Sequence, residues 1–180
     1  ADLHCHTRLS NGSLGIEDLI SLAKKRNIGT IAITDLDCLA GTVRGKIIGE
    51  RAGIRVITGV ELSATDKTNN QEIHLICYLP DFPDRLEGLC SKNSQLRKRS
   101  SHFMMLKVAQ RYPITTDFVA KCASGSTNIY KVHIMQALIE NGFTDKIYSD
   151  LYDELFNPDR ETSVNHSPEY DDVFSVLSAI

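Results

Sequence analysis

The sequence predicts an α/β fold that begins with a sheet of strand–helix–strand units and continues as a helical segment. Three observations indicate it. Strand-length apolar runs alternate with helical periodicity as far as about residue 81. From residue 82 onward the strand patterns stop and helical periodicity dominates. Histidines and carboxylates recur at or near the ends of the predicted strands, where α/β sheets place functional side chains.

The first part contains four predicted strands and two predicted helices. The first strand is short and ends at the tripeptide His4–Cys5–His6. The other strands are residues 30–34, 55–61 and 73–78, and the helices are residues 16–25 and 41–53. Repeated β-α-β units predict a parallel sheet, either open or closed into a barrel.

The second part is interpreted as an inserted helical subdomain. A long amphipathic helical pattern covers residues 86–109, and residues 132–140 are predicted to form another helix. A helix is predicted to begin at residues 114–117, which include a capping residue, and another is predicted to end at Asn141–Gly142. The predicted organisation is therefore residues 1–81 as the sheet domain, 82–165 as the helical cap, and 166–180 as a helical return to the sheet domain. Both ends of the sequence have the pattern of a truncated chain, so we expect the natural protein to continue beyond them.

Composition narrows the class of protein. The hydrophobic fraction is 42%, the charged fraction 24% and the formal net charge −3. These values are ordinary for a globular protein, and the negative net charge creates no positive field that could hold nucleic acid. The five cysteines are scattered without a C-x-x-C pair, which argues against disulfides and a cysteine zinc site. Without a long apolar run, we expect a cytoplasmic protein with no membrane attachment and no stable nucleic-acid binding; the oligomeric state is left open.

Polar side chains at the strand ends predict a metal site. In an H-x-H on a strand, both imidazoles point to the same side and can reach one ion. A lone H-x-H is more often incidental, and aspartates after a strand are often turn residues. Each of four consecutive strands nevertheless supplies such a residue, and this recurrence favours metal binding by imidazole and carboxylate groups. The residues concerned are His4 and His6, then Asp35 and Asp37, then Glu61, and then His74.

Four motifs in order resemble those of the PHP (polymerase and histidinol phosphatase) superfamily. They are D-L-H-C-H-T at residues 2–7, I-A-I-T-D-L-D at 31–37, G-V-E-L-S at 59–63 and I-H-L-I-C-Y at 73–78. In the helical part, I-Y-K-V-H-I at residues 129–134 is similar to a stretch of the small nucleotide-phosphatase branch. The resemblance extends over nearly the whole chain.

The resemblance implies a distorted (β/α)7 barrel, of which this chain would hold the N-terminal part with a helical insertion. It implies two or three divalent ions (Mn, Zn, Fe or Mg) and hydrolysis of phosphate esters. The small phosphorylated substrates would be nucleoside 3′,5′-bisphosphates or short 5′-phosphorylated oligonucleotides. Carried over by position, the metal ligands are His4, His6, Glu61 and His74. Glu61 would also be catalytic with support from Asp35, and Lys131 and His133 would bind substrate.

Three departures from the family pattern favour a second interpretation. Asn11 stands where an aspartate ligand is expected, and Leu36 stands where a histidine is expected. The later A-H-P and S-D-x-H motifs are absent. The alternative is therefore a degenerate or truncated PHP-like module with weak or no catalysis, retained for binding or for structure.

Overall fold

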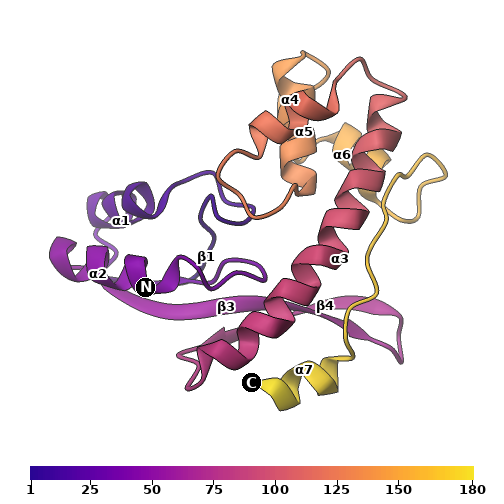
Figure 1. Ribbon diagram of the computed structural model, residues 1–180. Coiled ribbons are helices and arrows are strands. Elements are labelled where there is room, and N and C mark those ends of the chain that lie inside the picture. Colours follow the sequence, from indigo (N-terminus) through magenta and orange to yellow (C-terminus); the bar gives the residue numbers. More distant parts are fainter. The chain divides into compact units, whose positions relative to one another are not determined.

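The computed structural model describes residues 1–180 and contains four strands and seven helices (Figure 1). The chain divides into two compact units, residues 1–94 with 169–180 and residues 95–168, and one long helix runs from the first unit into the second. The elements in chain order are β1 (Asp2–Cys5), α1 (Ile16–Lys25), β2 (Thr30–Ile33), α2 (Thr42–Ala52), β3 (Arg55–Asp66), β4 (Gln71–Tyr78), α3 (Pro83–Ala109), α4 (Thr116–Cys122), α5 (Lys131–Glu140), α6 (Asp150–Phe156) and α7 (Val173–Ala179).

The sheet has the order β1-β2-β3-β4 and confirms the α/β class, but the prediction of a parallel sheet is wrong for β4. Strands β1, β2 and β3 are parallel, whereas β4 pairs antiparallel with β3. Residues 67–70 alone connect β3 to β4, too short a link for the crossover that a parallel pair requires. Asn70 adopts a left-handed backbone conformation with φ of 52°, as tight turns often demand.

Strand β3 changes partner along its length, and this places Glu61 differently from the prediction. Residues 55–58 pair with β2, and residues 59–66 pair with β4. Glu61 therefore lies inside β3 and not at its end, just beyond the last residue of β2. The predicted end at residue 61 is wrong because the hairpin with β4 extends the strand by five residues, to Asp66.

The two faces of β3 differ in chemistry. Val60, Leu62 and Ala64 alternate along the strand and pack in one core cluster with Leu86 of α3 and Val176 of α7. The intervening residues carry polar side chains, and the strand period of two places them on the opposite face. A second cluster joins α1 to β1 and β2. The candidate site therefore develops on the polar face of a strand whose opposite face is core.

The sheet is curled. Tyr78 on edge strand β4 donates a hydrogen bond from its hydroxyl to the Leu3 carbonyl oxygen of the opposite edge strand β1, at 2.7 Å. Four strands laid flat would separate the two edges by about 14 Å, too far for one tyrosine side chain. Gly59 lies opposite Tyr78 in the ladder, and a β-carbon there would meet the Tyr78 ring at 3.4 Å. A sheet that forms part of a barrel must be curled in this way.

The second unit is held together by an apolar core shared by the later part of α3 with α4, α5 and α6. The predicted caps are present: the Thr115 side chain accepts a hydrogen bond from the Phe118 amide at 3.2 Å, and Gly142 ends α5 with φ of 78°. Helix α6 has no counterpart among the individually predicted helices. It begins after Ser149, whose hydroxyl accepts from the Tyr152 amide at 3.4 Å.

The two units divide the chain inside a helix, whereas the sequence prediction divides it between elements at residue 82. Helix α3 continues from one unit into the other, so no composition change marks the division at residue 94. The chain returns to the first unit at Glu169, and Asp172 pairs with Thr65 of β3 just before α7. The domain boundaries 1–81, 82–165 and 166–180 remain a prediction.

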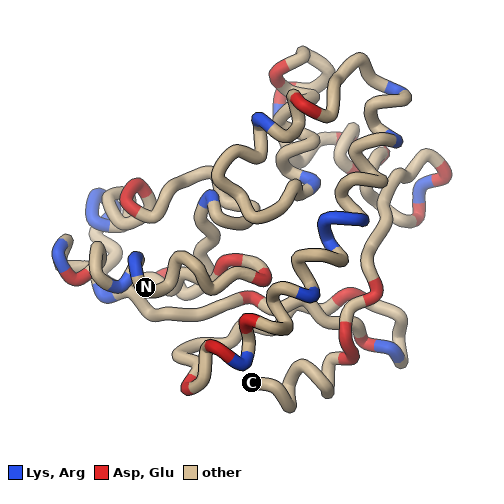
Figure 2. The backbone as a smooth tube through the Cα atoms, viewed as in Figure 1, with Lys and Arg blue, Asp and Glu red and all other residues tan.

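Charged residues of both signs are interspersed along the chain (Figure 2). No run of Lys and Arg is longer than three residues. No helix of this chain combines the length and the apolar character that crossing a membrane requires.

Candidate metal centre

Three histidines of the first unit converge on the carboxylate of Glu61. Its Oε2 atom lies 2.8 Å from His4 Nε2 and 2.9 Å from His6 Nε2. Its Oε1 atom lies 2.5 Å from His74 Nδ1. The structure therefore brings together all four residues that the sequence analysis names as metal ligands, with Glu61 between the histidine pair and His74.

Strand geometry explains this convergence. His4 and His6 are two residues apart, and Cys5 between them points into the core on the other side. Glu61 pairs with Ile76 in the antiparallel ladder, so His74 is its diagonal neighbour on the same face. Diagonal neighbours are within reach of long side chains, which is how the Glu61 carboxylate meets the His74 ring.

Asp35 lies behind the histidine pair and holds the loop that follows β1. It is 1% exposed. Its carboxylate accepts hydrogen bonds from the Thr7 amide at 2.6 Å, the Thr7 hydroxyl at 2.7 Å and the Ser10 hydroxyl at 2.6 Å. The Ser10 Oγ atom also lies 3.3 Å from His6 Nδ1. Asp35 is thus connected to His6 through Ser10, which limits the orientations of the imidazole.

The loop is tight enough to need a glycine. A β-carbon at Gly12 would lie 2.4 Å from the His6 carbonyl oxygen and 2.8 Å from that of Thr7. The Gly12 amide donates to the Thr7 carbonyl at 3.0 Å, which closes the loop. The Ser10–Asn11–Gly12 segment therefore fixes the position of His6.

A second buried aspartate organises the neighbouring part of the first unit. Asp37 accepts from the Ser63 amide at 3.0 Å, the Ser63 hydroxyl at 2.8 Å and the Asn93 side-chain amide at 2.8 Å. These contacts join the loop after β2 to β3 and to the first part of α3. Asp37 also has a left-handed backbone with φ of 49°, which aspartate tolerates better than most residues.

The electrostatics of the cluster keep its carboxylate charged. Burial alone raises the pKa of Glu61, but hydrogen bonds from His6, His74 and His4 outweigh burial and hold this pKa well below its ordinary value. The hydrogen bond to Glu61, followed by that to Glu72, raises the pKa of His74 to about 9. The His74 Nε2 atom lies 3.3 Å from Glu72 Oε1, so His74 stands between two carboxylates.

The donor atoms fit a divalent cation. His4 Nε2, His6 Nε2 and Glu61 Oε2 form a triangle with sides of 2.8, 2.9 and 3.1 Å. Ligand atoms about 2.1 Å from one ion, at right angles to each other, lie roughly 3 Å apart. The Glu61 side chain is 6% exposed and the His4 side chain 49% exposed, so the cluster has a buried carboxylate and an open side. An open side leaves room for water or substrate at a bound ion.

The two departures from the family pattern lie beside this cluster. Leu36 pairs with Glu61 in an isolated parallel bridge and is 3% exposed, so an apolar side chain occupies a position next to the carboxylate. The side-chain oxygen of Asn11 lies 3.2 Å from the Ser10 hydroxyl oxygen. The donor atoms that could share one ion are those of His4, His6 and Glu61, and His74 contacts the other oxygen of Glu61.

The predicted substrate-binding residues belong to the second unit. Lys131 is the first residue of α5, and its Nζ atom lies 5.7 Å from the centroid of the Phe156 ring. His133 is 8% exposed and accepts a hydrogen bond at Nδ1 from the Tyr130 amide at 3.0 Å, in the manner of a helix cap. Substrate binding by both residues remains a prediction.

Sequence reasoning missed the residues that support the ligands. Thr7 and Ser10 hold Asp35, Asn93 holds Asp37, and Glu72 contacts His74. A signal existed for Glu72, since it lies two residues before His74 on the same face of a strand. No local pattern marks Asn93, because it reaches Asp37 only through the packing of α3 on the sheet.

A curled α/β sheet with an imidazole–carboxylate cluster on its polar face defines this chain as a candidate metal-binding α/β protein. The sequence model of the PHP domain family matches residues 2–157, most of the chain. The chain belongs to the PHP domain family.

Curated relatives carry hydrolase names. A phosphoribosyl 1,2-cyclic phosphate 1,2-diphosphodiesterase of Eggerthella lenta is 29% identical over 157 residues, covering 86% of this chain and 60% of the relative. A 3′,5′-nucleoside bisphosphate phosphatase of Chromobacterium violaceum is 25% identical over 165 residues, covering 92% of this chain and 58% of the relative. The chain thus spans about 60% of the length of these relatives.

Two solved structures share the fold. One, from Bifidobacterium adolescentis, is provisionally assigned as a metal-dependent phosphoesterase; it has a TM-score of 0.87 and 24% identity, covering 99% of this chain and 62% of that chain. The other is an amidohydrolase from Chromobacterium violaceum with a TM-score of 0.86 and 21% identity, with the same coverage. The partial PHP barrel implied by the motifs is consistent with these neighbours.

Proposed function

We propose that this chain carries the metal centre of a divalent-metal-dependent phosphoesterase acting on small phosphorylated substrates. The observation that supports it most is the triangle of His4 Nε2, His6 Nε2 and Glu61 Oε2, whose sides match those of ligands around one ion. Glu61 would hold metal together with these histidines, and its second oxygen faces His74. Histidine with carboxylate favours Mn, Zn or Fe, with Mg a further candidate for a phosphoester reaction.

The residues of this chain have distinct parts in that chemistry. A bound divalent cation polarises a phosphoryl oxygen and lowers the pKa of a coordinated water. His4 and His6 would hold the ion, and Glu61 would supply the negative charge. Asp35 orients His6 through Ser10, and His74 donates its Nδ1 proton to Glu61 when no second ion is bound.

The finer proposal concerns the substrate. We infer a nucleotide-like substrate from the name of the Chromobacterium violaceum relative, a 3′,5′-nucleoside bisphosphate phosphatase, and from the motif around Lys131. A nucleoside 3′,5′-bisphosphate is the first candidate, and the motif resemblance adds a short 5′-phosphorylated oligonucleotide. Lys131 would bind a second phosphate as a flexible point charge. A monophosphate lacks that group, so Lys131 would contribute to selectivity and not to the reaction itself.

Metal content and phosphate release together test the function. The parent chain and a His4→Ala/His6→Ala variant are purified without chelator, analysed for metals, and assayed with a nucleoside 3′,5′-bisphosphate, a nucleoside monophosphate and Mn²⁺. We expect bound transition metal and weak phosphate release in the parent, and loss of both in the variant. In the same assay, Lys131→Ala should raise KM for the bisphosphate about tenfold more than for the monophosphate, and Lys131→Arg should not.

The same assay distinguishes the alternative function. Asn11 and Leu36 favour a module that binds metal or phosphate without turnover, since each replaces an expected ligand. Metal in the parent with no phosphate release from either substrate would establish that binding role. Equal metal content in the parent and in the double variant would refute the metal site itself.

A further inference from the structure

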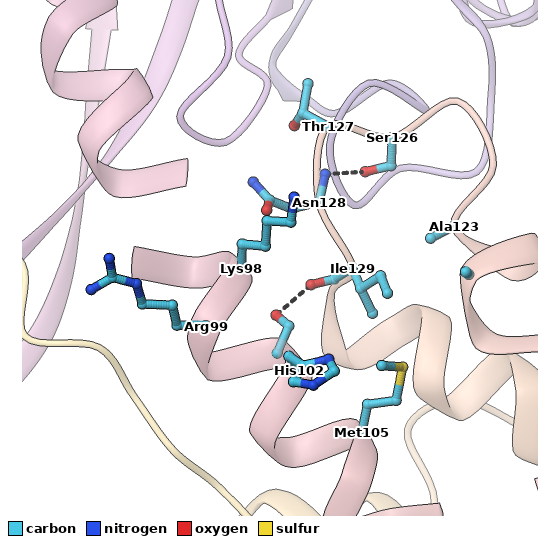
Figure 3. Close-up of a pocket in the computed structure, with 11 residues that line it drawn as sticks. Lys98, Arg99, His102, Met105, Ala123, Ser126, Thr127, Asn128 and Ile129 are labelled. Carbon is cyan, nitrogen blue, oxygen red and sulfur yellow. Dashed lines mark hydrogen bonds between the residues drawn. The ribbon is translucent and has the colours of Figure 1, made fainter. Parts of the chain in front are cut away.

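A pocket in the second unit is separate from the residues of the metal centre. It lies between α3, α4 and the segment 126–129, and its volume is about 560 Å³ (Figure 3). All of its lining residues belong to residues 95–168. Pockets that bind small organic molecules are typically 300–1,000 Å³, so this one has the size of a small-molecule site.

The polar part of the pocket contains basic side chains and no acidic one. Lys98, Arg99 and His102 line it, and no aspartate or glutamate does. None of these three residues forms an ion pair in the structure. Lys98 and His102 are four residues apart on α3 and therefore lie on the same helix face. In Figure 3, Lys98 points toward Asn128, while Arg99 points away from Met105 and Ile129.

The rest of the pocket is apolar. Met105, Ile129 and Ala123 line it; Met105 and Ile129 lie next to His102, and Ala123 lies near Ser126 (Figure 3). A methionine thioether adapts to flat ligands and gains from contact with aromatic rings. The pocket therefore combines the positive charge of Lys98 with an adaptable apolar surface.

The walls are held in place before any ligand arrives. The Ser101 hydroxyl donates to the Ile129 carbonyl oxygen at 2.5 Å, which fastens the segment 126–129 to α3. The Asn128 amide donates to the Ser126 hydroxyl at 3.4 Å, which closes a turn inside that segment. A pocket whose walls are already fixed loses little conformational entropy on binding.

We propose that this pocket binds an organic phosphate with a flat apolar body, independently of the metal centre. The Lys98 ammonium and the His102 imidazole on one helix face, with no carboxylate among the lining residues, suit an anion such as a phosphate monoester. The apolar surface formed by Met105, Ile129 and Ala123 suits a ring attached to that phosphate. A bare phosphate would leave the apolar part uncovered, and an uncharged ring would leave Lys98 without a counter-charge.

Fluorescence titration with 1-naphthyl phosphate in EDTA-containing buffer tests the proposal, because the chelator removes metal-dependent binding. We expect saturable binding to the full chain, weakened about tenfold or more in Lys98→Glu/His102→Ala. Ala120→Trp, which fills the pocket without changing its charge, should weaken binding similarly. Inorganic phosphate and 1-naphthol should each bind about tenfold more weakly than 1-naphthyl phosphate.

Two control variants keep the result specific. Lys107→Glu makes the same charge change on the same helix, outside the pocket, where Lys107 lies over the Phe103 ring. It should bind 1-naphthyl phosphate as the parent does, and so should His4→Ala/His6→Ala. No binding by the parent, an equal loss in Lys107→Glu, or an equal affinity for inorganic phosphate or 1-naphthol would overturn the proposal. Loss in His4→Ala/His6→Ala would place the binding at the metal centre and overturn it as well.

Discussion

At the residue scale, Glu61 organises the candidate centre because both of its oxygens have imidazole partners. Its burial would favour the neutral acid, yet hydrogen bonds from three histidines keep its pKa low. The motif resemblance identified Glu61, the three histidines and Asp35 from the sequence. It did not show how Asp35 acts, since the hydrogen bonds from Thr7 and Ser10 depend on how the loop after β1 folds.

Leu36→His should increase metal affinity while destabilising the metal-free fold. Leu36 is buried and pairs with Glu61, so a new imidazole would lie beside the carboxylate. Burying a polar ring without a partner costs about 1–3 kcal/mol of unfolding free energy in the absence of metal. Metal titration by calorimetry and urea unfolding with EDTA measure the two effects.

Leu36→Met is the matched control for that substitution, because it keeps an apolar side chain of similar volume. It should change neither metal affinity nor stability by much. If Leu36→His binds metal with the parent's affinity, the side chain at this position does not face the ion.

At the element scale, α5 shows how one histidine serves local structure. His133 caps the helix by accepting a hydrogen bond from the Tyr130 amide, and its side chain is buried. Sequence periodicity found α5 and its end at Gly142, but it did not reveal this cap. Periodicity also missed that β4 is antiparallel, because the alternation of side chains is the same in both orientations.

His133→Gln should alter the pH dependence of stability. Burial lowers the pKa of His133 below its ordinary value of 6.5, so the unfolded chain binds the proton more readily. The buried neutral ring therefore contributes stability above pH 6.5, and that contribution is lost as pH falls below it. Glutamine keeps the capping acceptor but does not titrate. Urea unfolding from pH 7.5 to 5 should show a shallower decline for the variant than for the parent.

His133→Ala supplies the comparison, because it removes both the cap and the titration. It should cost about 1 kcal/mol at pH 7.5, where His133→Gln should cost less. Parallel pH profiles for the parent and His133→Gln would show that protonation of His133 has no part in the acid sensitivity.

At the scale of the whole molecule, stability should depend jointly on pH and on metal. In the metal-free protein the pKa of His74 is raised to about 9, so its pair with Glu61 contributes fully below pH 6.5 and is lost as pH rises through about 9. Metal binding has the opposite trend, because ligands must be deprotonated. Thermal unfolding at pH 6, 7.5 and 9 should give a falling Tm with EDTA and a metal-induced rise in Tm that grows with pH.

His74→Gln tests the origin of that trend. It should flatten the decline of Tm between pH 6.5 and 9 in EDTA, since the titrating partner of Glu61 is gone. A Tm increase on adding Zn²⁺ or Mn²⁺ that is equal at pH 6 and pH 9 would contradict ligation by imidazole.

The sequence by itself determined the class of fold, most of the helices and strands, and the ligand candidates, because periodicity and short motifs are local properties of the chain. Only the tertiary structure decided that β4 turns back on β3, that the sheet curls until Tyr78 reaches Leu3, and that Glu61 faces three histidines. The tertiary structure also forms the pocket around Lys98 and Ile129. The physical reason is that these features depend on contacts between residues far apart in sequence, and local patterns carry no information about which distant partners will meet.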